Sequence, residues 1–274
     1  MDTSPKNRVK AWRDKALPGV ELLRAEYHKH HFPPHAHEEF AIGFIERGAQ
    51  GVLQERRERI VMPAGTICVI NAGQLHEGRE VTEAGWDYRM MYISPGDLKA
   101  MLSVPAEGVI HFPQSVIDDP QTLLAIRLAH ACSESGDASL LEQSSRLTLA
   151  LHQLVDRHAL RDRRVAAMLA MSGAVKRARE YIDANIAANP TLAEIGEAAG
   201  MSPFHLLREF RKAVGVAPHA YLVQRRVEQA RRLLLTGRPL RWIAMDIGYA
   251  DQAHLSREFR RFYGVPPSAM LSGA

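Results

Sequence analysis

The chain has few of the features that mark secreted or membrane proteins. Only two of its 274 residues are cysteines, Cys68 and Cys132, and their spacing fits neither a disulfide framework nor a metal motif. No apolar run reaches the roughly 18 residues needed to span a bilayer, and the first residues lack the apolar segment of a secretory signal. These absences favour a cytoplasmic protein with ordinary buried thiols.

Charge is distributed unevenly along the chain. The formal net charge is only +4, and the apolar and charged fractions of 46% and 24% are those of a soluble globular protein. From Gly173 to the end, however, the chain has 15 Lys and Arg and 9 Asp and Glu, a net charge of +6, whereas residues 1–172 have a net charge of −2. A basic carboxyl-terminal third indicates a polyanionic partner.

The same third contains an internal duplication. The run Leu192–Ile195, followed by Gly200, reappears 48 residues later as Leu240–Ile243, followed by Gly248. The run His205–Arg211 reappears 49 residues later as His254–Arg260. Each copy is too short to be a domain, so the repeat indicates one supersecondary unit used twice.

Local signals predict that each copy is a helix-turn-helix. In the first copy, Thr191 and Glu194 form a capping-box pattern, Gly200 suits a left-handed helix end, and Ser202 can cap a second helix. Asp251 occupies the corresponding cap position in the second copy. A helix, a short glycine turn and a second helix make up the helix-turn-helix motif.

The second helix of each copy has one apolar and one basic face. At 100° per residue, the positions expected to point inward are Leu206, Phe210 and Ala213, then Leu255, Phe259 and Phe262. Those expected to point outward are Phe204, Arg208 and Arg211, then Ala253, Arg257 and Arg260. Arginine can bind guanine or neutralise phosphate. A solvated charged face is the alternative, and the repetition of this chemistry favours DNA contact.

A long helix is predicted between the copies, from Pro218 to about Thr236. Its 19 residues would span about 28 Å, against about 34 Å between successive major grooves. One chain could therefore place both second helices in adjacent grooves, and the shorter spacer favours bent DNA. The helix also carries arginines that are candidates for phosphate contact or acidic partners: Arg225, Arg226, Arg231 and Arg232.

These residues resemble a known family. The tandem units, the two Arg-Glu-Phe-Arg helices and the ending Phe262–Pro267 are similar to the AraC/XylS family of bacterial transcription regulators, over about Val175–Met270. The resemblance implies a DNA-binding domain at 173–274 with helix-turn-helix units at 192–213 and 240–263. It also implies a homodimer and RNA polymerase as a partner. The implied DNA contacts are Ser202, Phe204, Leu207, Arg208, Arg211 and Lys212, then Gln252, Ser256, Arg257, Arg260 and Arg261.

Residues 1–117 are predicted to comprise an N-terminal arm and a small antiparallel barrel or sandwich, because short apolar and β-branched runs alternate with Gly and Pro from about Val20 to Ile117. Glu55–Arg59 is expected at a solvated hairpin end. Five of the 13 histidines lie within residues 28–37, ending in His35-Ala36-His37, and His76 follows later. This pattern resembles the cupin barrel, in which such histidines bind a divalent metal. The acidic ligand that such cupins carry four or five residues on is replaced here by Ala41 and Ile42, so no metal or other cofactor is predicted.

The family resemblance implies instead that the barrel senses a small molecule. The implied pocket residues are His35, His37, Glu39, His76, Trp86, Tyr88 and Arg89. Arg89 would suit an acidic effector such as an amino acid or carboxylate, although a salt-bridged arginine explains it equally well. Histidines that only tie strand ends together are the alternative for the cluster.

Residues 118–172 are predicted to be helical and to serve dimerisation or linkage. A 4/3 spacing joins Leu140, Ser144, Leu147, Leu151, Leu154 and His158. That stripe fits either packing on the barrel or a dimer seam. Arg161–Arg164 would begin the connection between domains, which ends near Gly173.

The sequence thus predicts an α+β multidomain protein: a cupin-like barrel with following helices, then an all-α domain of two helix-turn-helix units on a long helix. The predicted function is a ligand-responsive, sequence-specific DNA-binding transcription regulator and not an enzyme. Two alternatives stay open. One is a metal-dependent cupin enzyme with an appended DNA-binding domain, and the other is a constitutive DNA-binding protein with a structural barrel.

Overall fold

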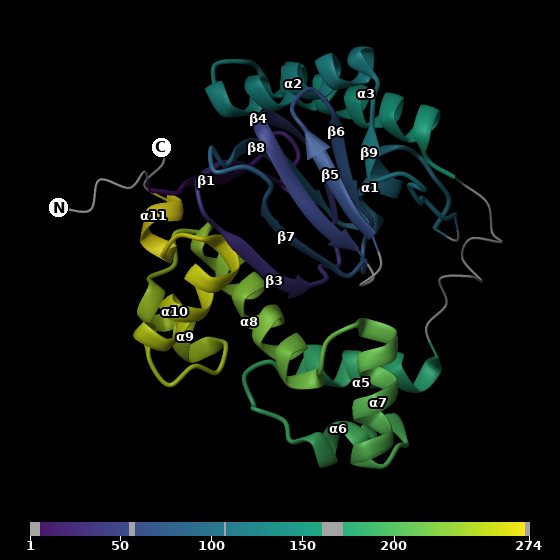
Figure 1. The fold of residues 1–274 in the computed structure, drawn as a ribbon, viewed down its shortest axis with the longest axis vertical. Helices are drawn as coiled ribbons and strands as arrows, with labels where there is room; N and C mark the ends of the chain where they lie inside the picture. Colours follow the sequence, from purple (N-terminus) through teal and green to yellow (C-terminus); the bar gives the residue numbers. More distant parts are fainter. Residues whose placement is uncertain (1–5, 55–57, 107, 161–171, 272–274) are drawn as a thin grey trace. The chain divides into compact units, whose positions relative to one another are not determined.

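A computed structural model describes residues 6–54, 58–106, 108–160 and 172–271 (Figure 1). The chain divides into two compact units, one of residues 1–31 and 36–169 and one of residues 170–272, with which residues 32–35 are also grouped. Most of the expected hairpin end at 55–59 and of the connection at 161–172 lies outside the described residues. Within the described part of the chain, no helix has the length and apolar character to cross a membrane.

The first unit is built on an antiparallel sheet, as the strand-and-turn pattern predicts. Its strands are β1 (Arg8–Arg13), β2 (Val20–Tyr27), β3 (His31–His35), β4 (Phe40–Gln54), β5 (Glu58–Pro63), β6 (Ile67–Ile70), β7 (His76–Glu80), β8 (Trp86–Ile93) and β9 (Val116–Ile117). The main strand order is β1-β2-β8-β4-β6-β9, and β5 and β7 also pair with β4.

Strand β4 joins two layers of this sheet. Residues 40–48 pair with β8, whereas residues 49–54 pair with β5 and residues 50–54 with β7. The β4–β8 register shifts between Ile45 and Arg47, which marks a bulge where the strand bends. At Gly43 an added Cβ would lie 1.9 Å from the carbonyl oxygen of Arg89, so β4 and β8 approach too closely for any side chain there.

Two helices complete the core of the first unit, beside the short α1 (Pro95–Met101). Helices α2 (Pro120–Ser135) and α3 (Leu140–His158) lie side by side over one face of the sheet (Figure 1). Leu147, Leu151 and Leu154 are buried in one core with sheet residues such as Ile42 and Met91. These leucines of the predicted stripe therefore pack within the chain, and α2 and α3 belong to the same compact unit as the sheet.

The second unit is all helical, as predicted. Its helices are α5 (Gly173–Ala184), α6 (Leu192–Ala199), α7 (Pro203–Val214), α8 (Pro218–Leu234), α9 (Leu240–Asp246), α10 (Gln252–Tyr263) and α11 (Pro267–Leu271). The predicted helix signals are confirmed. Thr191 and Glu194 form a reciprocal capping box, Gly200 has a φ of 70°, and the Ser202 and Asp251 side chains cap α7 and α10.

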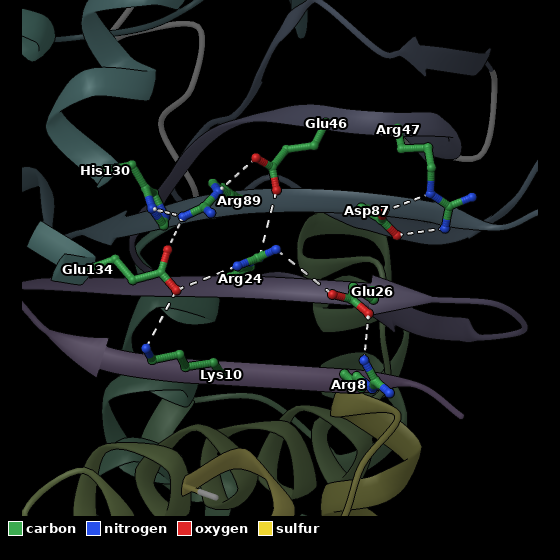
Figure 2. Close-up of polar contacts among 10 residues, drawn as sticks. All are labelled: Arg8, Lys10, Arg24, Glu26, Glu46, Arg47, Asp87, Arg89, His130 and Glu134. Carbon is green, nitrogen blue, oxygen red and sulfur yellow. Dashed lines mark hydrogen bonds and ion pairs between the residues drawn. The ribbon is translucent and has the colours of Figure 1, made fainter. Parts of the chain in front are cut away.

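An ion-pair network crosses the first unit on the helix side of the sheet (Figure 2). Arg89 on β8 pairs with Glu134 of α2 and, at 3.0 Å, with Glu46 of β4. Glu134 also faces Lys10 at 3.5 Å and Arg24 at 3.8 Å. The network joins β1, β2, β4 and β8 to the end of α2, and its alternating charges offset the cost of covering Arg89.

His130 is the fully buried member of this network. Arg89 donates to its Nδ1 at 3.1 Å, since a guanidinium can only donate. Burial, reinforced by the positive charge of Arg89, lowers the pKa of His130 from 6.5 to about 3. The imidazole is therefore neutral in the folded protein at ordinary pH.

We predict that His130 makes the first unit acid-sensitive. Because its folded pKa lies below that of the unfolded chain, the unfolded chain binds one more proton between these values. The free energy of unfolding should fall as pH drops from about 6.5, by up to about 1.4 kcal/mol per pH unit. His130→Gln can still accept from Arg89 but cannot titrate. Between pH 6.5 and 5, urea unfolding should show that the free energy of unfolding falls by about 1–2 kcal/mol more for the parent than for His130→Gln. Parallel pH profiles would contradict the assignment.

Candidate functional site

The inner faces of α7 and α10 anchor both helices in the second unit. Leu206 and Phe210 on α7, and Leu255 and Phe259 on α10, are completely buried, as predicted. The prediction for Ala213 is wrong, because this residue is exposed and Val214 at the end of α7 is buried in its place. One step along a helix moves a side chain by 100°, which is enough to exchange the two positions.

The outer faces of these helices present the predicted DNA contacts to solvent. The exposed residues among them are Ser202, Phe204, Leu207, Arg208, Arg211 and Lys212 in the first copy, and Gln252, Arg257, Arg260 and Arg261 in the second; Ser256 is half-buried. Arg208 lies 3.1 Å from Glu209 and Arg261 lies 3.6 Å from Glu258. Exposed pairs of this kind are weak, so the guanidiniums can exchange them for phosphate or guanine.

The arginines of α8 have a different role from the one predicted. Arg225 is buried and binds Asp183 at 2.8 Å and Glu228 at 2.6 Å. Arg226 is buried and donates to the carbonyl oxygen of Ile186 at 2.6 Å and to Asn189 at 2.7 Å. Arg231 is buried as well. The expectation of phosphate contact is therefore wrong for these three, because their side chains are buried inside the unit, whereas Arg225 does have acidic partners, Asp183 and Glu228 of the same chain.

Helix α8 connects the two helix-turn-helix units as predicted. It has 17 residues, about 25 Å at 1.5 Å per residue. It contacts both helix-turn-helix copies: Tyr221 and Leu222 lie in the core of the first copy, and the Arg226 guanidinium lies 5.5 Å from the ring of Tyr249 in the second. One rigid element thus carries both outward faces.

In the first unit the structure brings the predicted histidines together. His37 and His76 are buried with ring centroids 4.9 Å apart, and Tyr92 of β8 lies 5.6 Å from His37. The Nδ1 atoms of His37 and His76 lie 2.7 and 3.0 Å from the carbonyl oxygens of Glu39 and Gln74. Since a carbonyl only accepts, Nδ1 carries a proton in both residues, and in the neutral form of the ring Nε2 is the acceptor.

This arrangement is one that can hold a metal ion or a hydrogen-bonding ligand. Within the described residues, the ligand atoms of His35, His37 and His76 all lie within 4.8 Å of one another. The Nδ1 of His35 likewise meets a carbonyl oxygen, that of Pro33, at 2.8 Å. Neutral imidazoles held by their Nδ1–H are the form in which histidine ligates divalent cations.

Two more of the predicted pocket residues lie in an aromatic cluster of the first unit. Trp86 and Tyr88 pack against Tyr27, with ring centroids 5.2 and 5.8 Å from it. They share a face of β8 with Tyr92, but four or more residues away, which is about 13 Å or more. Tyr92 and Tyr27 are missing from the residues predicted from the sequence. The alternation of residues along β8 places Tyr92 on the same face as Tyr88, so it could have been found from the sequence. Tyr27 is brought there by the pairing of β2 with β8, which the sequence does not show.

Arg89 points to the opposite face of β8, where it meets Glu46, Glu134 and His130 (Figure 2). The salt-bridge alternative therefore explains this residue better than an acidic effector does. Of the two cysteines predicted to be buried, Cys68 is buried, which raises its pKa to about 12, whereas Cys132 is half-buried. Glu39 is buried, and its carbonyl oxygen accepts from His37.

Comparison with known proteins agrees with this two-part organisation. Residues 17–151 match the AraC-like ligand binding domain, and residues 195–273 match a helix-turn-helix domain. The chain is 29% identical over 238 residues to the uncharacterised HTH-type transcriptional regulator YbfI of Bacillus subtilis, covering 86% of this chain and 85% of that protein.

Among solved structures, the chain is similar to ToxT of Vibrio cholerae O395, with a TM-score of 0.61, 13% identity and 98% of each chain covered. A similar match is wild-type ToxT of strain SCE256 with unsaturated fatty acid bound, at a TM-score of 0.60 and 13% identity, covering 98% of this chain and 96% of that one. At this identity the likeness establishes the fold. The two matched domains and YbfI, and not this likeness, identify the chain as an AraC-type ligand-binding domain followed by the helix-turn-helix domain of a transcription regulator.

Proposed function

We propose that the first unit binds a small-molecule effector at the cluster of the buried His37 and His76 and the half-buried Tyr92, and that this binding controls transcription through the second unit. The observation that carries the proposal is the fixed orientation of the imidazoles, whose Nδ1 atoms are held by backbone carbonyl oxygens. Their Nε2 lone pairs suit a ligand with a hydroxyl or amine donor. The fatty acid bound to ToxT supports small-molecule binding by this fold. A ligand alters regulation only if it binds two states of the protein unequally.

We assign base reading to the exposed residues of α7 and α10. Arg208 and Arg257 occupy equivalent positions in the two copies, each about one turn into its helix. Both project from the face opposite a buried apolar anchor, which is how a recognition helix meets the major groove. The flanking cations Arg211, Lys212 and Arg260 would contact phosphate.

A homodimer is proposed on the outer surface of α2 and α3. Leu124 and Leu128 of α2 and Leu141 and Leu149 of α3 are exposed, although α2 and α3 already bury other leucines against the sheet. Leu149 is 69% exposed. An apolar patch on two adjacent helices fits the self-complementary interface of a two-fold dimer.

The proposed protein partner is RNA polymerase. The proposed compartment is the cytoplasm, where a bacterial regulator meets both DNA and RNA polymerase. The second copy supplies a candidate contact surface. On α9, Trp242 and Met245 are 46% and 62% exposed, whereas the equivalent positions in the first copy are Glu194 and Glu197. Exposed Trp and Met are typical of protein interfaces.

Arg208→Ala and Arg257→Ala should each weaken binding to a natural promoter by roughly 5- to 100-fold, as expected for losing a base contact of about 1–3 kcal/mol. Electrophoretic mobility shift at fixed salt measures this. Lys176→Ala, which removes an exposed cation of α5, serves as the control and should bind nearly as the parent does. If both arginine variants bind as tightly as the parent, α7 and α10 are not the reading helices.

A metabolite that occupies the His37–His76 cluster should raise the melting temperature of the full chain. At 100 times its Kd a ligand adds about 2.7 kcal/mol of stability. His37→Ala and His76→Ala should abolish the shift, whereas His152→Ala, at an exposed position of α3, should retain it. Divalent metals are screened in parallel on protein without a His-tag. A shift with metal alone would favour the metal-dependent alternative, and no shift with any compound would favour a structural barrel.

Leu149→Glu should convert the homodimer to a monomer, because a buried carboxylate would face apolar surface across the interface. Light scattering after size-exclusion chromatography distinguishes the 30.6 kDa monomer from a particle of twice that mass. Val81→Glu makes the same kind of change at an exposed position elsewhere in the first unit and should remain dimeric. A monomeric parent, or a dimeric Leu149→Glu, would refute the assigned surface.

A further inference from the structure

The two recognition helices share a scaffold but differ in the chemistry of their outer faces. Phe204 and Leu207 of α7 are 76% and 39% exposed. The equivalent positions on α10 are Ala253 and Ser256. The first helix thus offers two large apolar side chains where the second offers a methyl group and a hydroxyl.

The fold does not account for Phe204 and Leu207. The core of the first helix-turn-helix contains Leu206, Phe210 and Val214 of α7, but not these two residues. The second copy forms the same fold with Ala253 and Ser256 in their place. A large apolar side chain that is exposed in the free protein is therefore available for a ligand.

The surroundings of these residues identify the ligand as DNA. Phe204 is the second residue of α7, at the amino-terminal end from which recognition helices reach base edges. Leu207 and Arg208 follow three and four residues later on the same side, with Arg211 and Lys212 beyond them. Cations beside an apolar contact suit the phosphate backbone that lies next to the bases.

Within the major groove, the C5-methyl group of thymine is the apolar feature that a protein can read. We infer that α7 recognises thymine methyl groups through Phe204 and Leu207, so that the part of the operator bound by the first helix-turn-helix requires thymine. The second helix reads polar base edges instead, since Gln252 can pair with adenine and Ser256 can donate or accept. This inference rests on the proposed binding mode and adds the base chemistry of each half.

Deoxyuridine substitution tests this inference, because deoxyuridine differs from thymidine only by lacking the C5-methyl group of the base. Binding sites are first selected from random DNA with the full-length chain. Each thymine of the selected site is then replaced by deoxyuridine in turn. At the positions read by α7 the parent should lose roughly 4-fold in affinity per methyl, as expected for one buried methyl group.

The double variant Phe204→Ala/Leu207→Ser carries the residues of the second copy. Because both positions are exposed, it should fold as the parent does, which circular dichroism checks. It should bind the thymine site more weakly and bind thymine and deoxyuridine versions equally. The matched control Ser256→Ala should keep the parent's response to deoxyuridine at the α7 positions.

The outcomes separate the inference from the function it rests on. If the parent binds both versions of every site equally, thymine-methyl reading is overturned while DNA binding stands. If the double variant binds and selects sites as the parent does, Phe204 and Leu207 face another partner and the inference also fails. If the parent selects no site at all, the proposed DNA-binding mode itself fails.

Discussion

The buried arginines of α8 are the constraint on which DNA recognition depends. Arg225 binds Asp183 of α5 and Glu228 of its own helix, and Arg226 ties α8 to the loop after α5 while stacking on Tyr249. Removing one member of such a network would leave buried charge without a partner, which is costly. These contacts fix both helix-turn-helix units to one helix, so that the outward faces of α7 and α10 are presented together.

A duplicated scaffold with divergent surfaces is well suited to an asymmetric DNA site. Both copies use the same capped helices and the same buried Leu and Phe anchors. Their outer faces agree in arginine and differ at Phe204 and Leu207 against Ala253 and Ser256. Selection for folding acts on the inner faces, which frees the outer faces to specialise. The same reasoning applies to Trp242 and Met245 on α9, where the first copy has glutamates.

The sensory unit separates its polar groups onto two sides of one strand. On β8, Trp86, Tyr88 and Tyr92 share one face, whereas Arg89 faces α2 and is held by Glu46 and Glu134. Alternation along a strand sends neighbouring residues to opposite sides. Tyr88 and Arg89, adjacent in sequence, therefore serve different purposes: Tyr88 packs against Tyr27, and Arg89 joins the sheet to α2.

The sequence by itself determined the repeated unit, its capping residues and the arginine-bearing faces of α7 and α10, because these follow from local spacing along single helices. It also pointed to His37 and His76 as partners. Only the tertiary structure decided which charges are accessible: Arg208 and Arg225 look alike in sequence, yet one is exposed and the other is buried against Asp183 and Glu228. The ion pairing of Arg89 with Glu46 and Glu134, and the burial of Leu147, likewise follow only from the tertiary structure. Burial depends on which distant segments pack against a residue, and a local pattern does not contain that information.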